Sequence, residues 1–298
     1  MLLSDDEADY VDQVIDRARK LIRTGIWEGI SESRLDSWLG CLRNFDAELL
    51  AAYLIDNLFF RSRDQYFALL DSLFLDLPFP RAQPATTLMD CVRCRKTSSE
   101  YNGIRIAPVI GQFAPPTKSG PYILRLAQRR FRIQSDWLTW PHVICGDDAV
   151  SDVYFVDDFC GTGGQFEEFL KGIKFDAFIK DRPEVNVNYL VTTIHSDGLE
   201  HIQNIFPSVK VKWAERLSGA NAILKTECLG RYKVERFAER ILLQYESAVK
   251  QAALPSAGKF ADGFGQLGLA YAFAHATPNN TLPIFWMGTP ALTPLLDR

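Results

Sequence analysis

The segment Val153–Gln165, with the sequence Val-Tyr-Phe-Val-Asp-Asp-Phe-Cys-Gly-Thr-Gly-Gly-Gln, combines residue types that can hold a sugar phosphate. Its first four residues are apolar, as expected for a strand covered on both faces of a parallel sheet. The glycines at 161, 163 and 164 permit a tight bend in which backbone N–H groups converge on an anion. Asp157 and Asp158 would repel a phosphate, so their carboxylates should accept hydrogen bonds from hydroxyls or meet a cation.

A helix should follow this glycine turn. Phe166, Phe169 and Leu170 recur at helical spacing, and the N-terminus of a helix favours a phosphate through its dipole and its unpaired N–H groups. The alternative is an ordinary strand-to-helix turn in which Asp158 is a solvated cap and the glycines serve positive φ angles. Three glycines within four residues, after two acids on an apolar strand, favour the anion site.

The same segment resembles the phosphoribosyl-diphosphate (PRPP) binding motif of type I phosphoribosyltransferases. That motif has four apolar residues, two acids, a short apolar stretch and then Thr-Gly-Gly-Thr. The resemblance implies that Asp157 and Asp158 bind the ribose 2′ and 3′ hydroxyls. It also implies Mg²⁺ as a cofactor that binds with PRPP, and assigns no metal-ligating residue. The 5′-phosphate would be held by Gly161, Thr162, Gly163, Gly164 and Gln165, of which Gln165 replaces the usual Thr or Ser.

Composition limits the class of protein. The chain has 298 residues and 47% hydrophobic residues, which suffices for one large domain or for a core domain with a smaller one. Its apolar runs are far shorter than the ~20 residues of a membrane span, and its acidic start lacks the basic region of a signal peptide. Six scattered cysteines suit free thiols in a reducing compartment. We therefore expect a cytoplasmic protein with no membrane partner.

Charge is distributed unevenly along the chain. Residues 1–80 contain eight Lys and Arg against fifteen Asp and Glu, whereas residues 81–150 contain ten against five. The basic stretch lies just before the glycine turn, where it would attract an anionic ligand. Because the N-terminal region and the whole chain are acidic, direct nucleic-acid binding is disfavoured.

The first 76 residues read as a series of helices. Ser4 with Glu7, and Ser62 with Gln65, form capping boxes ahead of amphipathic stretches. Three prolines within residues 77–84 end the series. These patterns predict an α-helical module over residues 1–80 and an α/β domain over residues 81–298.

After Pro84, strand and helix patterns alternate. This alternation predicts an α/β fold with a doubly wound, mainly parallel sheet that binds its ligand at the carboxyl ends of the strands. The type I phosphoribosyltransferase resemblance implies the same fold. The expected strands are 103–110, 142–145, 153–156, 185–193, 209–214 and a closing strand 267–273, and the expected helices are 122–132, 166–174 and 227–250.

Further candidate residues lie at the other strand ends. Lys118 and Ser119 lie in the loop that leads into the predicted helix 122–132, where they could bind a diphosphate, or could equally form a capped helix start with a solvated lysine. His195 follows an apolar strand and could face a base or a nucleophile; a satisfied histidine in a turn is the commoner explanation. Cys91 and Cys94 form a single CxxC without the second pair that structural zinc needs. Cys160 should pack as a small hydrophobic residue, in a position where a helix N-terminus would lower its pKa.

Looser patterns over most of the chain resemble a divergent branch of phosphoribosyltransferase-like proteins linked to bacterial conflict and anti-phage systems, some of them encoded beside retron reverse transcriptases. The resemblance implies an effector or toxin role, with a reverse transcriptase or another defence-system protein as the partner. Two hypotheses stay open at this point. One is a Mg²⁺-dependent glycosyl-transfer enzyme that uses PRPP or a related ribose phosphate, and the other is a non-catalytic module of the same fold that senses such a ligand and regulates a partner.

Overall fold

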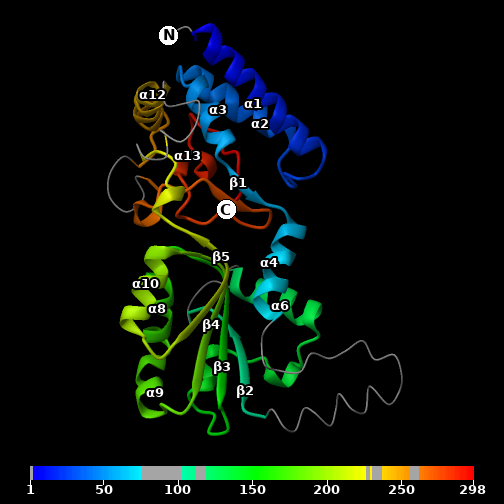
Figure 1. Ribbon diagram of the computed structural model, residues 1–298, viewed down its shortest axis with the longest axis vertical. Helices are drawn as coiled ribbons and strands as arrows, with labels where there is room; N and C mark the ends of the chain where they lie inside the picture. Colours follow the sequence, from blue (N-terminus) through cyan, green and yellow to red (C-terminus); the bar gives the residue numbers. More distant parts are fainter. Residues whose placement is uncertain (1–2, 76–101, 112–118, 226–228, 230–236, 256–261) are drawn as a thin grey trace, which may run out of the picture. The chain divides into compact units, whose positions relative to one another are not determined.

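The computed structural model describes residues 3–75, 102–111, 119–225, 229, 237–255 and 262–298 (Figure 1). Contacts between Cα atoms divide the chain into two compact units: Met1–Tyr66 with Ser218–Arg298, and Phe67–Leu217. The expected boundary after residue 80 falls outside the described residues. The contacts group Ser218–Arg298 with the N-terminal helices, whereas the sequence patterns had assigned that segment to the α/β domain.

The unit Phe67–Leu217 is built on a four-stranded parallel sheet. Its strands, in spatial order, are β2 (Ile104–Pro108), β3 (Asp152–Cys160), β4 (Asn186–His195) and β5 (Lys210–Leu217). β3 has a neighbouring strand on each side, and its residues 153–156 are at most 3% exposed. The uninterrupted apolar run in the sequence is therefore the signature of a strand buried on both faces.

Helices cover both faces of this sheet (Figure 1). α6 (Ser119–Phe131) lies on one face, and α8 (Gly164–Gly172), α9 (Phe175–Asp181) and α10 (Ser196–Ile205) lie on the other. Phe155 of β3 is fully buried beneath α8 and α9, with edge-on contacts to Phe166, Phe169 and Phe175 at ring-centroid distances of 6.2, 5.1 and 5.0 Å. This layered arrangement confirms the predicted α/β fold with a doubly wound parallel sheet.

The four strands lie side by side in chain order, and an isolated bridge on the outer side of β2 marks a change in the direction of the chain. After α6, the chain passes through a short 3₁₀ turn (Ser135–Trp137) and returns beside β2, where Leu138 forms a parallel bridge with Ile106. The Thr139 N–H donates to the Ile106 carbonyl at 3.1 Å. The chain then crosses to the opposite side of β2 to form β3. Ligands of open α/β sheets bind outside the carboxyl ends of the strands at such a switch point, which here is formed by β2 and β3.

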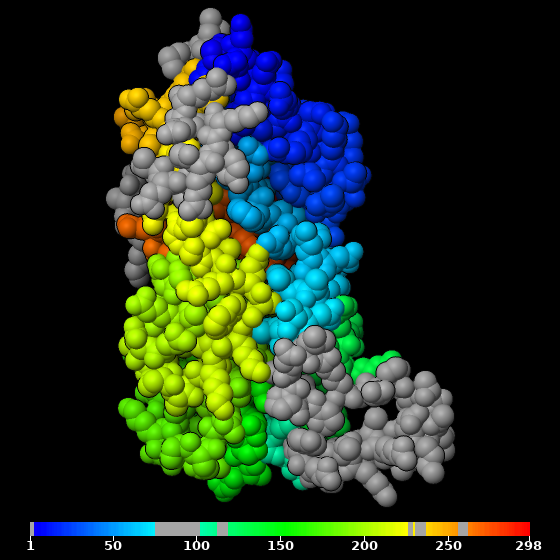
Figure 2. All heavy atoms as spheres, viewed as in Figure 1, coloured from blue at the N-terminus to red at the C-terminus, as the bar shows by residue number. Residues whose placement is uncertain are grey.

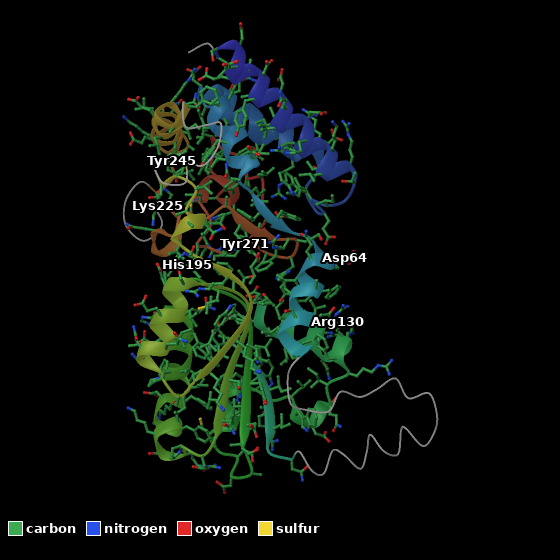
Figure 3. The ribbon with its side chains drawn as sticks, in the orientation of Figure 1. Asp64, Arg130, His195, Lys225, Tyr245 and Tyr271 are labelled. Carbon is green, nitrogen blue, oxygen red and sulfur yellow. The ribbon has the colours of Figure 1, made fainter. Side chains whose placement is uncertain are left out.

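The unit Met1–Tyr66 with Ser218–Arg298 has its own hydrophobic core, formed by both segments. For example, Trp38 stacks on Phe285 with ring centroids 5.9 Å apart, and its indole N–H donates to the Ile284 carbonyl at 2.9 Å. Tyr271 (Figure 3) lies in β6 (Tyr271–Phe273), which pairs in parallel with β1 (Phe59–Arg61). The elements of this unit are α1 (Asp5–Arg23), α2 (Glu32–Asn44), α3 (Glu48–Asp56), β1 (Phe59–Arg61), a 3₁₀ turn (Gly219–Asn221), α12 (Ala238–Gln251), a 3₁₀ turn (Phe264–Gln266), β6 (Tyr271–Phe273) and α13 (Pro283–Trp286).

The two predicted capping boxes are confirmed. The Ser4 N–H donates to the Glu7 carboxylate at 2.8 Å, at the start of α1. At the start of α4 (Arg63–Leu75), the Ser62 N–H donates to Gln65 Oε1 at 3.1 Å, and the Gln65 N–H donates to Ser62 Oγ at 3.3 Å. α4 carries the chain from one unit into the other.

Three local predictions were wrong. The expected strand at 142–145 is a short helix, α7 (Pro141–Ile144), because proline at its first position presets the helical φ angle. The N-terminal region is not wholly helical, since it contains β1. β6 lies within the expected closing strand 267–273 but pairs with β1 instead of joining the larger sheet, a non-local pairing that periodicity does not reveal.

The outer edge of β5 carries charged residues. β5 pairs with β4, and no second partner strand occurs among the described residues. Lys210 and Arg216 are exposed, and Figure 2 shows yellow atoms of this region at the surface. Charged side chains on an edge strand discourage pairing with another chain.

A helix that crosses a membrane is long and predominantly apolar. Within the described part of the chain, no helix has both the length and the apolar character that crossing a membrane requires.

Candidate functional site

The acid pair lies at the carboxyl end of β3, the strand that borders the switch point. Asp157 is 4% exposed and Asp158 is 8% exposed, so neither carboxylate extends into bulk water. Asp157 Oδ2 accepts a hydrogen bond from the Tyr189 hydroxyl at 3.0 Å, and its Oδ1 accepts from the Asp158 N–H at 3.0 Å. Burial, and then the neighbouring charge of Asp158, raise the pKa of Asp157 well above its usual range.

Asp158 has different neighbours. Its Oδ1 accepts hydrogen bonds from the Phe159 N–H at 2.9 Å and from the Ser119 hydroxyl at 3.1 Å. Ser119 is the first residue of α6, which follows β2 in the chain. Gly120 allows this approach, since a Cβ there would lie 2.9 Å from the Val109 carbonyl oxygen. The structure thus brings together Ser119 and Asp158, two predicted site residues 39 positions apart in the chain.

The predicted phosphate loop forms a tight turn from β3 into α8. Gly163 is the N-cap of α8 and has a φ of +82°, in the left-handed region that favours glycine. Gly161, Thr162 and Gly164 complete the turn, and Gln165 is exposed in the first turn of the helix. Backbone N–H groups at such a helix start can bind a phosphate.

α10 packs directly against this loop. A Cβ on Gly198 would lie only 2.4 Å from the Gly161 carbonyl oxygen, so the helix and the loop pack backbone to backbone. A Cβ on Gly163 would lie 2.9 Å from the ring of His201, whose Nε2 is 2.6 Å from a carboxylate oxygen of Glu167. The shape of the loop therefore depends on two glycines and on the position of α10.

The residues at the end of β4 have structural partners. Thr192 is fully buried and its hydroxyl donates to the Asp158 carbonyl at 2.5 Å. His195 is 1% exposed, at the point where β4 passes into α10 (Figure 3). Its Nδ1 accepts from the Asp197 N–H at 3.2 Å, which makes it the N-cap of α10. The proposed contact of His195 with a base or nucleophile stays a prediction.

Other predicted features are only partly placed. Lys118 lies outside the described residues, as do Cys91 and Cys94, so the structure does not bear on their roles. Cys160 is 5% exposed and packs as a small hydrophobic residue, as predicted. The expectation of a lowered thiol pKa was wrong, because burial and the nearby Asp157 charge raise the pKa of Cys160 to about 12.

Sequence reasoning missed Tyr189, Gly198 and His201. Tyr189 stood within a run read only as an apolar strand, yet a buried tyrosine hydroxyl needs a hydrogen-bonding partner. Its ring stacks on Phe166 at 3.9 Å, and burial, with the charge of Asp157, raises its pKa well above the usual range, so it stays a donor. Gly198 offered one signal, since a glycine in a helix can indicate a close backbone approach.

The acid pair offers at most two neighbouring carboxylates to a metal ion. The described residues contain no cluster of three or more His, Cys, Asp and Glu side chains that could hold a metal ion. Mg²⁺ at phosphate sites is usually bound by one or two carboxylates together with phosphate oxygens and waters. Asp158, at the end of β3, is a carboxylate of the required kind.

Comparison with known proteins identifies the family of the chain. None of the curated proteins matches the chain. A family model, PRTase-CE, matches residues 35–298, which include both strands of the switch point, the acid pair and the glycine turn. The chain therefore belongs to the PRTase-CE family and is a phosphoribosyltransferase-like protein.

Proposed function

We propose that the carboxyl end of β3 binds PRPP, or a related ribose 5-phosphate or nucleotide, together with Mg²⁺, and that the protein transfers the ribosyl group. The observation that carries this proposal is the buried acid pair at the switch point, followed directly by a glycine turn into α8. A carboxylate at this place can accept hydrogen bonds from ribose hydroxyls, while the turn presents N–H groups to the 5′-phosphate.

The chemistry of each group indicates its role in the proposed reaction. The N–H groups of the Gly161–Gly164 turn and the start of α8 would hold the phosphate. Asp158 would orient the ribose, and its negative charge would stabilise the positive charge that develops on the anomeric carbon as pyrophosphate leaves. Mg²⁺, when bound, neutralises the leaving pyrophosphate. Such a transfer depends mainly on positioning and charge, so it does not require His195 to act as a base.

A second candidate function is non-catalytic sensing of the same ligand. The observation that favours it is the engagement of Asp157 by Tyr189 and by the backbone, which leaves fewer polar groups for a reacting substrate. The exposed Gln165, where related transferases usually have a hydroxyl residue, points in the same direction. In this case ligand binding would change the interaction with a partner protein.

The resemblance to conflict-associated proteins supports a role as an effector in bacterial anti-phage defence. A reverse transcriptase or another protein of the same defence system is the proposed partner. Cells that carry the complete system with Asp158→Asn should lose protection against phage while the protein still accumulates. Full protection by that variant would show that ligand binding at this site is not needed for defence.

Calorimetric titration of the purified protein with PRPP tests the biochemical proposal. Wild type should bind PRPP more tightly with Mg²⁺ than without it, and Asp157→Asn/Asp158→Asn should weaken binding by roughly tenfold or more. Asp152→Asn is the matched control, because Asp152 is an acid at the opposite end of β3 and should bind as wild type. Pyrophosphate release indicates the enzyme, and binding without turnover indicates the sensor. Absence of binding that depends on the acid pair would overturn both.

A further inference from the structure

The two acids of the motif have neighbours on opposite faces of the sheet. Asp157 is held by Tyr189, whose ring packs on Phe166 in the layer of α8. Asp158 is held by Ser119 at the start of α6, on the other face (Figure 1). Successive side chains of a strand point to opposite faces, so a ligand that contacts Asp158 on the α6 face does not meet the Asp157 carboxylate on that face.

Asp157 and Thr192 fix the backbone of Asp158 from two directions. Asp157 Oδ1 accepts the N–H of Asp158 at 3.0 Å, and the Thr192 hydroxyl donates to the carbonyl of Asp158 at 2.5 Å. Both groups are buried, so these hydrogen bonds are protected from competition with water. The position of the Asp158 carboxylate is thereby set by residues of β3 and β4.

We propose that the acid pair is functionally divided, so that Asp158 together with Ser119 contacts the ribose hydroxyls, while Asp157 is a positioning residue that acts through Tyr189 and through the backbone of Asp158. This inference rests on the proposed function, because it assigns roles within the same ribose-phosphate site. It departs from the role of direct ligand for both acids that the motif resemblance implies. The raised pKa of Asp157 is consistent with a carboxyl group that forms hydrogen bonds in the protein interior and does not contact the ligand.

Conservative amide variants separate the two roles. In Asp157→Asn, the amide oxygen can still accept from the Asp158 N–H, and the amide NH₂ can donate to the Tyr189 hydroxyl oxygen, because a phenol both donates and accepts. Both positioning hydrogen bonds can therefore still form, and the one with Tyr189 has its donor and acceptor exchanged. In Asp158→Asn, an oxygen is replaced by a donor and the charge is lost, so hydrogen bonds from ribose hydroxyls are weakened.

The test is the dissociation constant of PRPP with Mg²⁺, measured by calorimetry for wild type and for both single variants. We expect Asp158→Asn to weaken binding roughly ten- to hundredfold, in line with the loss of a hydrogen bond to a charged group. Asp157→Asn should stay within about threefold of wild type, a change of less than one hydrogen bond. Asp157→Ala cannot make either positioning contact and should weaken binding more than Asp157→Asn.

Measurements of stability separate a loss of folding from a loss of ligand binding. Thermal melts of all variants, compared with the Asp152→Asn control, identify those that remain folded, and rescue of the alanine defect by asparagine is the diagnostic result. If folded Asp157→Asn binds as weakly as Asp158→Asn, Asp157 is a direct ligand and the division is overturned. If Asp157→Ala binds as wild type, the positioning role is overturned. Failure of wild type itself to bind PRPP would refute the proposed function before any variant is compared.

Discussion

Replacing Gly198 with alanine should destabilise the unit that contains the glycine loop. The new Cβ would lie 2.4 Å from the Gly161 carbonyl oxygen and 3.0 Å from Cys160 Sγ. Ordinary C···O contacts are about 3.3 Å or longer, so helix α10 and the loop would have to separate by roughly 1 Å. Because the closest atom belongs to the backbone, rotation of a side chain cannot relieve the contact.

Two opposing contributions determine how far Gly198→Ala changes the free energy of unfolding. Overpacking of this kind costs about 1–3 kcal/mol, and the better helix propensity of alanine returns up to about 1 kcal/mol. With the full offset, the free energy of unfolding should fall by up to about 2 kcal/mol, which lowers Tm by up to roughly 8 °C for a domain of this size. The displaced Gly161 carbonyl should also weaken PRPP binding.

Circular dichroism melts measure the stability term without any ligand, so this prediction does not depend on the proposed function. Gly172→Ala is the matched control, since Gly172 ends α8, and a Cβ there would meet nothing within 4 Å. The control should melt at the temperature of wild type or slightly above it. A Gly198→Ala protein as stable as Gly172→Ala would refute the claim that the loop is braced by backbone contact with α10.

Three further predictions concern packing, pH and reactivity. Phe155→Ala should lower the free energy of unfolding by about 3–5 kcal/mol in urea denaturation, because the ring is fully buried among three others, and a loss below about 1 kcal/mol would contradict this packing. The hydrogen bond from Arg34 lowers the pKa of Asp297, so this pair should stabilise the protein at neutral pH and lose that contribution as the pH falls through the lowered pKa. The Tm difference between wild type and Asp297→Asn should accordingly shrink in acid, whereas a difference independent of pH would argue against the pair. The Cys160 thiol, with a pKa of about 12, should resist alkylation at pH 8 in the folded protein and react after unfolding, as mass spectrometry of its peptide can show.

The sequence predicted the local features that depend on neighbouring residues. The apolar run before Asp157 is typical of a strand covered on both faces, and Phe166, Phe169 and Leu170 lie on one buried face of α8. The capping boxes could also be predicted from the sequence, since each depends only on two residues three positions apart. Short periodic patterns also predicted the alternation of strands and helices that leads to the α/β fold.

Only the tertiary structure decided how distant segments combine. The bridge between Ile106 and Leu138, which creates the switch point, depends on the path of the chain around β2. The pairing of β1 with β6 likewise joins segments more than 200 residues apart and leaves no periodic signal in either.

The chemical character of the acid pair was decided in the same way. The two aspartates are identical neighbours in the sequence, but Tyr189 from β4 holds one and Ser119 from α6 holds the other. Burial and charge around a carboxyl are set by all the elements that surround it, and therefore its pKa and its partners are properties of the fold. The residue types predicted a ribose-phosphate site here, and the packing of β3 between α6 and α8 determined which acid faces which layer.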